Sequence, residues 1–533
     1  MSTHKKIDVI CIVSTILTIV LTVLLMGEKV LAITPAVSEE VISDMFTAND
    51  LNADWDTSAA TKIALSDQNS AISGNGAYVH DGDVYIAYAG HYVLTGELMN
   101  GSIIIDADKN DKIWISLDGV TLHCDDDAAI RIEQADKVFL TLAAGTENIV
   151  SSGAQYESEI AASGVDGTIY SRDDLTINGT GSLVVNAEYN HGIVCNDDLV
   201  IAGGNITINA VQDGIHANDS VRIQNAAISI SAGDDGITVS NDDETAFLYI
   251  ESGSIAIPAC YEGLEAVDIT IAGGTIDIMP TDDGINASGS GSGIRITDGD
   301  ITIINPSGRD ADGLDSNGSI YIEGGKVFIS VSDSGGNCAL DYGSENGGEC
   351  VISGGMVIAC GGSAMAEGFA SDSSQGFLMY NTTAAAGTTI NLVDSAGREL
   401  LFEEIPCSFS SVVLSTPELK LGDTCTLTIN GVQEQITIDN ASISGFSPVG
   451  MFGGGMRDNR NRSEIQEVSG RPHMPDAGQF QENGGRLPKQ DQGQMHPEET
   501  FSSSGISTDT FILLGVSVLF LMTGLFIAIK IKH

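Results

Sequence analysis

Acidic side chains recur at a regular step through the middle of the chain, where their carboxylates could bind a metal ion. An acidic residue followed by glycine returns every 21 to 29 residues, and His191-Gly192 takes the equivalent place in one unit. The acidic steps begin at Asp166, Asp213, Asp235, Glu262, Asp283 and Asp312. Carboxylate and amide oxygens are hard ligands, which favour calcium over zinc. The predicted calcium ligands are Asp213, Asp234, Asp235, Glu262, Glu265, Asp282, Asp283 and Asn286.

The spacing expected for these acids matches a calcium bridge. Equivalent residues of neighbouring strands lie about 4.8 Å apart, where two ionised carboxylates repel by roughly 3 kcal/mol at an effective dielectric near 20. Two oxygens that each lie about 2.4 Å from one Ca²⁺ are at most about 5 Å apart. The alternative is that the Asp-Gly steps only form turns. Glu262 and Glu265 favour a calcium site, because glutamate is a poor turn former.

A repeat of this period predicts a solenoid that would place the acids on one edge. Each unit holds two or three short apolar strands separated by polar or glycine turns, and segments such as LVIAGG and NITINA alternate with period two. No segment predicts a helix long enough for a βαβ crossover. We therefore expect an all-β, parallel β-helix with β caps. Paired glycines fit tight corners that need positive φ, at 203–204, 273–274, 324–325 and 354–355.

Three further residues are predicted to contact a ligand. His191 and His216 flank the same corner and either contact ligand or only occupy a polar turn. Trp114 alternates out of phase with Ile113 and Ile115, so it faces away from the core as a platform or a cap contact. The predicted ligand contacts are His216, Tyr261 and Trp114. A second acidic row follows the first strand of each coil, at Asp173, Asp174, Asp197, Asp198, Asp219, Asp242 and Asp243.

Charge and cysteine content restrict the partners. The formal net charge of −50 opposes binding to nucleic acid or to an anionic membrane surface and favours cations. The nine cysteines form no CxxC zinc pattern. Cys338, Cys350 and Cys360 are close enough in sequence to form a disulfide, and buried free thiols are the alternative.

The chain ends predict export and a membrane anchor. Residues 1–32 resemble a signal peptide, with an uncleaved anchor as the alternative, and the apolar run 510–529 is long enough to span a bilayer. Lys530 and Lys532 place its end in the cytoplasm and the folded part outside. We divide the remainder into an N-terminal segment and cap (33–100), a β-helix (101–365), a C-terminal β module (366–445) and a Gly/Pro/Gln/Met-rich linker (446–509).

An ordered series of segments resembles the clostridial-type β-helix carbohydrate-binding proteins. The segments are AGHYVLTGEL, GSIIIDA, KIWISLDGVTL, AIRIEQADKVFLTLAAGTENIV, GTIYSRDDLTINGTGSLVVNA and YEGLEAVDITIAGGTIDIMPTDDGIN, and the resemblance covers residues 77–439. It implies an exported, calcium-bearing, right-handed parallel β-helix that looks like pectate lyases and binds cellulose and polygalacturonate. Two features depart from the pattern, the coil opening with His191-Gly192 and the segment QNAAISI without paired glycines.

These features predict a cell-surface protein that binds acidic (uronate) or cellulosic polysaccharide with the help of calcium. A calcium-dependent pectate lyase is the first alternative, and it needs a base, usually Lys or Arg, beside the metal. A structural adhesin or envelope spacer is the second. The basic residues between Asp166 and Asp315 favour a protein that is not an enzyme, because they comprise no lysine and only Arg172, Arg222, Arg295 and Arg309.

Overall fold

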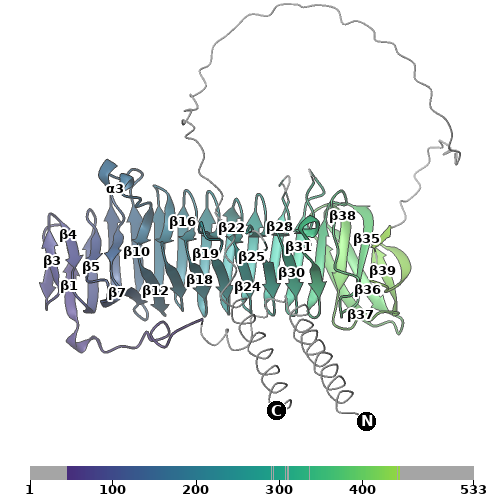
Figure 1. The fold of residues 1–533 in the computed structure, drawn as a ribbon, viewed down its shortest axis with the longest axis horizontal. Coiled ribbons are helices and arrows are strands. Elements are labelled where there is room, and N and C mark those ends of the chain that lie inside the picture. The colour runs from purple at the N-terminus through teal and green to yellow at the C-terminus, as the bar shows by residue number, and fades with distance from the viewer. Residues whose placement is uncertain are drawn as a thin grey trace, which may run out of the picture. The chain divides into compact units, whose positions relative to one another are not determined.

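The described part of the chain is a stack of β-coils with almost no helix (Figure 1). The computed structural model describes residues 45–444, except residues 290, 292, 307, 309, 310, 335 and 441. Within these residues the α-helical structure is limited to α3 (Ser158–Ala162), and η1 (Thr57–Ala59) and η2 (Ser344–Asn346) are short 3-10 helices. Successive coils pair through parallel strands, so the predicted all-β, parallel β-helix is confirmed.

Each coil contributes short strands to three faces. Face 1 is a twelve-stranded sheet in which β3 and β4 pair antiparallel and the later strands pair in parallel. This face carries the acidic residues singled out by the repeat. Its strands are β3 (Ala77–His80), β4 (Asp83–Ile86), β6 (Ile103–Asp106), β8 (Ile130–Gln134), β11 (Gly167–Ser171), β14 (His191–Cys195), β17 (Ile215–Ala217), β20 (Ile237–Val239), β23 (Leu264–Ala266), β26 (Ile285–Ala287), β29 (Leu314–Ser316) and β32 (Leu340–Tyr342).

Faces 2 and 3 form one larger sheet, because the long strand β7 (Lys112–Cys124) pairs with β9 at its start and with β10 at its end. Face 2 continues as β9 (Lys137–Leu142), β12 (Asp174–Gly179), β15 (Asp198–Ile201), β18 (Ser220–Ile223), β21 (Phe247–Ile250), β24 (Asp268–Ile271), β27 (Gly293–Ile296), β30 (Ser319–Ile322) and β33 (Cys350–Ile352). Face 3 continues as β10 (Glu147–Ser152), β13 (Ser182–Ala187), β16 (Asn205–Ala210), β19 (Ala226–Ala232), β22 (Gly253–Cys260), β25 (Thr275–Pro280), β28 (Asp300–Asn305), β31 (Lys326–Val331) and β34 (Met356–Gly361).

Aliphatic side chains stack in register inside the coils. On face 1, Ile215 pairs with Ile237, Ile237 pairs with Leu264, and Leu264 pairs with Ile285; all four are 0% exposed. Branched side chains suit the extended backbone and pack well between strands. Burial of each such side chain contributes about 1.5–3 kcal/mol. This internal stack holds one coil against the next and so fixes the register of the polar residues outside.

Left-handed residues form the corners between faces 2 and 3. The second glycine of each predicted pair has positive φ, with 94° at Gly204, 93° at Gly274, 77° at Gly325 and 86° at Gly355, so the predicted corners are confirmed. In the segment QNAAISI, which lacks the pair, Asn225 adopts φ 54°. Asparagine tolerates this conformation better than most residues, which explains how the corner is kept there.

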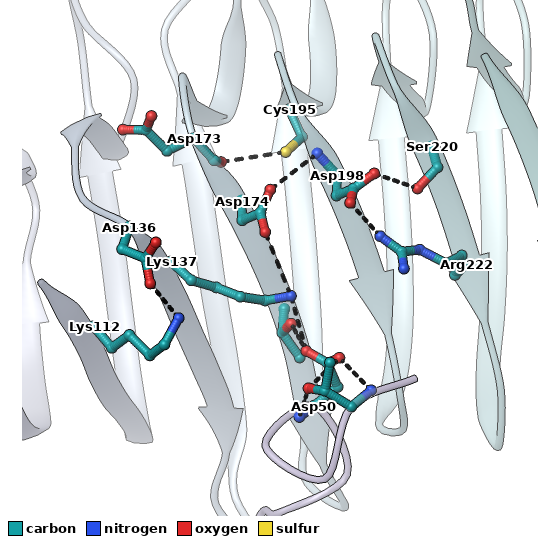
Figure 2. Close-up of polar contacts among 12 residues, drawn as sticks. Asp50, Lys112, Asp136, Lys137, Asp173, Asp174, Cys195, Asp198, Ser220 and Arg222 are labelled. Carbon is teal, nitrogen blue, oxygen red and sulfur yellow. Dashed lines mark hydrogen bonds and ion pairs between the residues drawn. The ribbon is translucent and has the colours of Figure 1, made fainter. Parts of the chain in front are cut away.

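An N-terminal strap, defined here as residues 45–56, crosses face 2 before the first coil begins. The Asp50 side chain is 1% exposed and accepts a hydrogen bond from Thr176 Oγ1 at 2.6 Å, and it pairs with Lys137 Nζ at 3.0 Å (Figure 2). Trp55 Nε1 donates to Thr141 Oγ1 at 3.2 Å. The strap leads through η1 to β1 (Thr61–Leu65), β2 (Ala71–Ser73) and β5 (Gly90–Leu98), of which β1 and β5 pair in parallel.

An antiparallel module ends the described chain. The last face 3 strand, β34, pairs antiparallel with β38 (Phe409–Ser415), which also pairs with β35 (Phe377–Ala384). The predicted C-terminal β module contains two hairpins, β36 (Thr388–Asp394) with β37 (Glu399–Ile405), and β39 (Thr424–Ile429) with β40 (Val432–Thr437). The short β41 (Ser442–Ser444) runs parallel to β35. These strands have their own apolar core around Phe409, Leu414 and Leu427.

The eight cysteines of the described residues are buried and free, so Cys338, Cys350 and Cys360 do not form the disulfide that their spacing allowed. No helix among the described residues is long and apolar enough to span a membrane. The predicted signal peptide (1–32), linker (446–509) and transmembrane segment (510–529) lie outside the described residues and stay predictions.

Candidate functional site

The acidic-glycine steps come together as one row along face 1. We call Asp213, Asp235, Glu262, Asp283 and Asp312 the acidic row. Their equivalence is fixed by main-chain hydrogen bonds, since Gly214 N donates to Asp235 O, and Gly236 N donates to Glu262 O, both at 2.9 Å. Each residue therefore lies one coil above the last, as the repeat predicted.

The side chains of the acidic row also bind the main chain of the next coil. Asp213 Oδ1 accepts a hydrogen bond from Asp235 N at 3.2 Å, and Asp235 Oδ1 accepts one from Glu262 N at 2.9 Å. Asp283 and Asp312 repeat the arrangement, accepting from Asp312 N at 2.6 Å and Cys338 N at 2.5 Å. In these four residues one carboxylate oxygen has a structural role, which leaves the second oxygen for other partners.

A second set of polar residues lies beside the acidic row. We call His216, Thr238, Glu265, Asn286, Asp315 and Asp341 the outer row, because they pair in register along β17, β20, β23, β26, β29 and β32. Outer-row side chains contact the free oxygens of the acidic row. Thr238 Oγ1 donates to Asp235 Oδ2 at 3.2 Å, and Asn286 Nδ2 donates to Glu262 Oε2 at 3.0 Å.

Crowding of carboxylates raises several pKa values in these rows. Burial, reinforced by the charges of Glu265 and Asp235, raises the pKa of Glu262 to about 8. Burial and the charges of Asp315 and Asp312 raise the pKa of Asp283 to about 8. The pKa of Asp235 rises to about 6, mainly through burial. A bound cation would stabilise the ionised carboxylates that burial and mutual repulsion disfavour here.

The two rows form groups that could hold a metal ion. Asp235, Glu262 and Glu265 each offer one carboxylate oxygen, and these oxygens lie within 4.8 Å of one another. Asp213, Asp234 and Asp235 meet the same limit. Of the other predicted ligands, Asn286 contacts Glu262, whereas Asp282 and Asp283 fall outside the three-residue groups found in the described residues. The oxygen-only donors and their spacing fit calcium.

Sequence reasoning missed the C-terminal end of these rows. Asp312, Cys338 and Asp341 form another group within 4.8 Å. Burial, with the charge of Asp341, raises the pKa of Asp315 to about 6. Asp312 begins one of the recognised acidic-glycine steps, so the repeat already contained the signal. Asp315 and Asp341 are not followed by glycine, and their place in the outer row depends on the register between coils, so the sequence does not single them out.

The second acidic row, unlike the row on face 1, lies beside basic side chains. Asp174 lies 3.8 Å from Lys137 Nζ, and Asp198 lies 2.5 Å from Arg222 Nη2 and accepts from Ser220 Oγ at 2.6 Å (Figure 2). Asp173 accepts a hydrogen bond from Ala135 N at 2.9 Å. Ion pairs and main-chain contacts thus neutralise part of this row, which gives it a structural role beside the strap.

Comparison with known proteins gives the family. The family described as "Carbohydrate-binding domain-containing protein" matches residues 80–357, more than half of the chain. The chain belongs to this carbohydrate-binding domain family. A protein of the same description from Acetivibrio thermocellus is 38% identical over 146 residues, which are 27% of this chain and 51% of the relative, so the chain spans about half of that relative's length.

One solved structure is also similar to this member of the family. It is titled as a polysaccharide lyase-like protein from C. thermocellum in a gadolinium derivative, and it is 30% identical with a TM-score of 0.41. The similarity covers 49% of this chain and 96% of that one.

The three predicted ligand contacts of this family member lie in different places. His216 belongs to the outer row and contacts Asp213. Tyr261 is 48% exposed, and its hydroxyl is hydrogen bonded to Asp282, which raises its pKa to about 12. Trp114 lies on β7 and stacks between His91 and Phe139, with ring centroids 4.8 and 5.2 Å away. Trp114 therefore belongs to the large sheet and not to face 1, and its contact with a ligand stays a prediction.

Proposed function

We propose that this protein binds polysaccharide at face 1 with the help of calcium, and that its glycan is an acidic (uronate) or cellulosic chain. Membership of the carbohydrate-binding domain family supports a glycan ligand. The observation that carries the proposal is the group Asp235, Glu262 and Glu265, whose oxygens lie within 4.8 Å on the outside of the coils. We further propose that the protein is of the clostridial β-helix type, with right-handed coils.

Calcium is proposed because the donors of this group are all oxygens. Asp235, Glu262 and Glu265 would hold the ion, and Asn286 lies close enough to contribute its amide oxygen after rotation of the side chain. A bound calcium ion would neutralise the carboxylates and offer coordination positions to sugar carboxylate or hydroxyl oxygens. Without a cation the same surface would repel an acidic glycan.

Export and membrane anchoring belong to the same proposal. The signal-like residues 1–32 and the apolar run 510–529 are the features that support it. An extracellular location would give the site free calcium and access to cell-wall glycans. The linker 446–509 would then hold the folded part away from the membrane.

Binding is favoured over a lyase reaction by the positions of the arginines. Arg172 Nε pairs with Glu133 at 2.8 Å, Arg222 pairs with Asp198 at 2.5 Å, and Arg295 pairs with Glu323. Arg222 and Arg295 lie on face 2, away from Glu262. Arg309 lies outside the described residues. A lyase would need a base beside the metal, and Arg172, Arg222 and Arg295 are engaged elsewhere.

A binding assay with purified full chain tests the proposal. Polygalacturonate and cellulose are each presented with calcium and with EDTA, and ultraviolet absorbance follows any unsaturated product. We expect glycan retention with calcium, loss of retention with EDTA, and no sustained absorbance. Sustained EDTA-sensitive absorbance would replace binding by the lyase alternative, whereas no retention in any condition would favour a structural adhesin.

A further inference from the structure

A mixed nitrogen and oxygen cluster lies at the N-terminal end of the acidic row. His191 begins β14, His216 lies in β17, and Asp213 precedes β17 by one glycine. Asp213 Oδ2 lies 2.8 Å from His216 Nδ1 and 3.2 Å from His191 Nδ1. The imidazole ring centroids are 5.0 Å apart. One carboxylate oxygen thus receives two imidazole nitrogens from neighbouring coils.

His191 Nδ1 faces both a main-chain donor and a carboxylate oxygen of Asp213, and a metal ion could bridge the nitrogen to that oxygen. Asp213 N donates to His191 Nδ1 at 3.2 Å, so in the neutral imidazole this nitrogen carries a lone pair. The same nitrogen faces Asp213 Oδ2 at 3.2 Å, which sets two lone pairs against each other. A proton or a metal ion between His191 Nδ1 and Asp213 Oδ2 would turn this repulsion into attraction. A metal ion would bind the Nδ1 lone pair that otherwise accepts the hydrogen bond from Asp213 N.

We propose that His191, Asp213 and His216 form a binding site for a divalent transition-metal ion of the zinc type. Imidazole nitrogens favour zinc, copper and nickel, whereas the oxygen-only group beside it favours calcium. Zinc lies about 2.0–2.2 Å from nitrogen and carboxylate ligands in a tetrahedron, so its ligand atoms are about 3.3–3.5 Å apart. The distances of 2.8 and 3.2 Å require only a small outward shift.

The site is accessible and separate from the proposed calcium group. The side chains of His191 and His216 are 17% and 29% exposed, while that of Asp213 is 7% exposed, so an ion can enter from outside onto a buried carboxylate. Asp213 Oδ2 is the oxygen that contacts both imidazoles, while Oδ1 accepts from Asp235 N. The proposed calcium group Asp235, Glu262 and Glu265 does not include Asp213, so the two sites have no ligand in common.

Titration of the full chain with Co²⁺ and Zn²⁺ tests this site. We expect Co²⁺ to give ligand-field absorption bands typical of low coordination number, and Zn²⁺ to abolish them in the presence of excess Ca²⁺. His191→Asn and His216→Asn should each weaken Zn²⁺ binding by at least about 100-fold, since loss of even an outer-shell partner costs 10–100-fold. Circular dichroism checks that each variant is folded.

Two control variants separate this site from other histidines and from the calcium proposal. His123, which contacts Ser151 Oγ at 2.9 Å on face 3, provides His123→Asn as the matched histidine control. Glu262→Gln should lose calcium binding and keep the zinc affinity. Absence of cobalt bands, or equal zinc affinity in the wild type and both His191→Asn and His216→Asn, would overturn the transition-metal site without bearing on calcium or glycan binding.

Discussion

The residues of the acidic row have a structural role beside the ligand-binding role that we propose for them. Asp235 uses Oδ1 to bind Glu262 N and turns Oδ2 toward Thr238. In the sequence, each Asp-Gly step could be explained either as a turn or as a metal ligand. One carboxylate can serve both roles, because one oxygen binds the main chain and the other is directed outward. Glu262 differs, because its longer side chain directs Oε2 to Asn286. Whether a step carries Asp or Glu therefore determines which carboxylate oxygens are available to bind a cation.

The raised pKa values predict a pH dependence of stability in the metal-free chain. Glu262 and Asp283 have folded pKa values of about 8, above those of unfolded carboxyls. The native state therefore binds these protons more tightly, so their contribution to stability is full below the unfolded pKa of about 4 and is lost as pH rises to the folded pKa. With EDTA present, we expect the melting temperature to fall by several degrees between about pH 6 and about pH 9.

Glu262→Gln is the control for this pH dependence. The variant cannot ionise at residue 262, so its melting temperature should fall less over the same interval. A wild-type melting temperature that is constant or rises from about pH 6 to about pH 9 would contradict the raised carboxyl pKa values.

At the scale of the elements, the glycine of each acidic-glycine step is required by the close approach of two coils. A Cβ on Gly236 would lie 2.5 Å from Gly263 O and 2.7 Å from Ile257 Cδ1. A Cβ on Gly214 would lie 2.7 Å from Gly236 O, and a Cβ on Gly263 would lie 2.3 Å from Gly284 O. Since none of these three has positive φ, space rather than turn conformation selects glycine here.

Gly236→Ala should therefore destabilise the coil stack. The added methyl group cannot fit without moving the neighbouring coil, and overpacking of this kind costs about 1–3 kcal/mol. Urea unfolding followed by circular dichroism measures the change. Gly90→Ala is the matched control, because the closest contact of its Cβ would be the hydroxyl oxygen of Tyr92, at 3.4 Å. Equal stability of the two variants would show that the coils are not as close as described.

The buried Asp50 of the strap should contribute to the stability of the coils. Asp50 is buried, but hydrogen bonds from Thr176 and Thr47 and the charge of Lys137 hold its pKa below the ordinary value. Asp50→Ala removes these partners and leaves Lys137 without its 3.0 Å contact, which we expect to cost about 3 kcal/mol. Denaturant unfolding measures the loss. Asp54→Ala, at an exposed position of the same strap, should be nearly neutral.

Much of the fold was predictable, whereas the contacts between coils were not. Period-two alternation and the glycine pairs contain enough information for the parallel coils and their corners. His191 and His216 were expected at the same corner, but their contacts with one oxygen of Asp213 depend on side-chain rotamers, which the sequence does not determine. The strap could not be foreseen either, since Asp50 and Thr176 are 126 residues apart.

Across the whole molecule, the charge of −50 leads us to expect that cations stabilise the fold and assist the proposed glycan binding. A ligand that binds only the folded state stabilises it by about 2.7 kcal/mol at 100 times its dissociation constant. We therefore expect calcium at that excess to raise the melting temperature and EDTA to lower it. An unchanged melting temperature would contradict a structural calcium ion.

Anomalous scattering from crystals of the protein grown with calcium would locate the proposed ion. We expect a calcium peak within coordination distance of the carboxylates of Asp235, Glu262 and Glu265, and loss of this peak in Glu262→Gln crystals. A map without a peak at these three residues, in crystals that hold calcium elsewhere, would contradict the proposed calcium site.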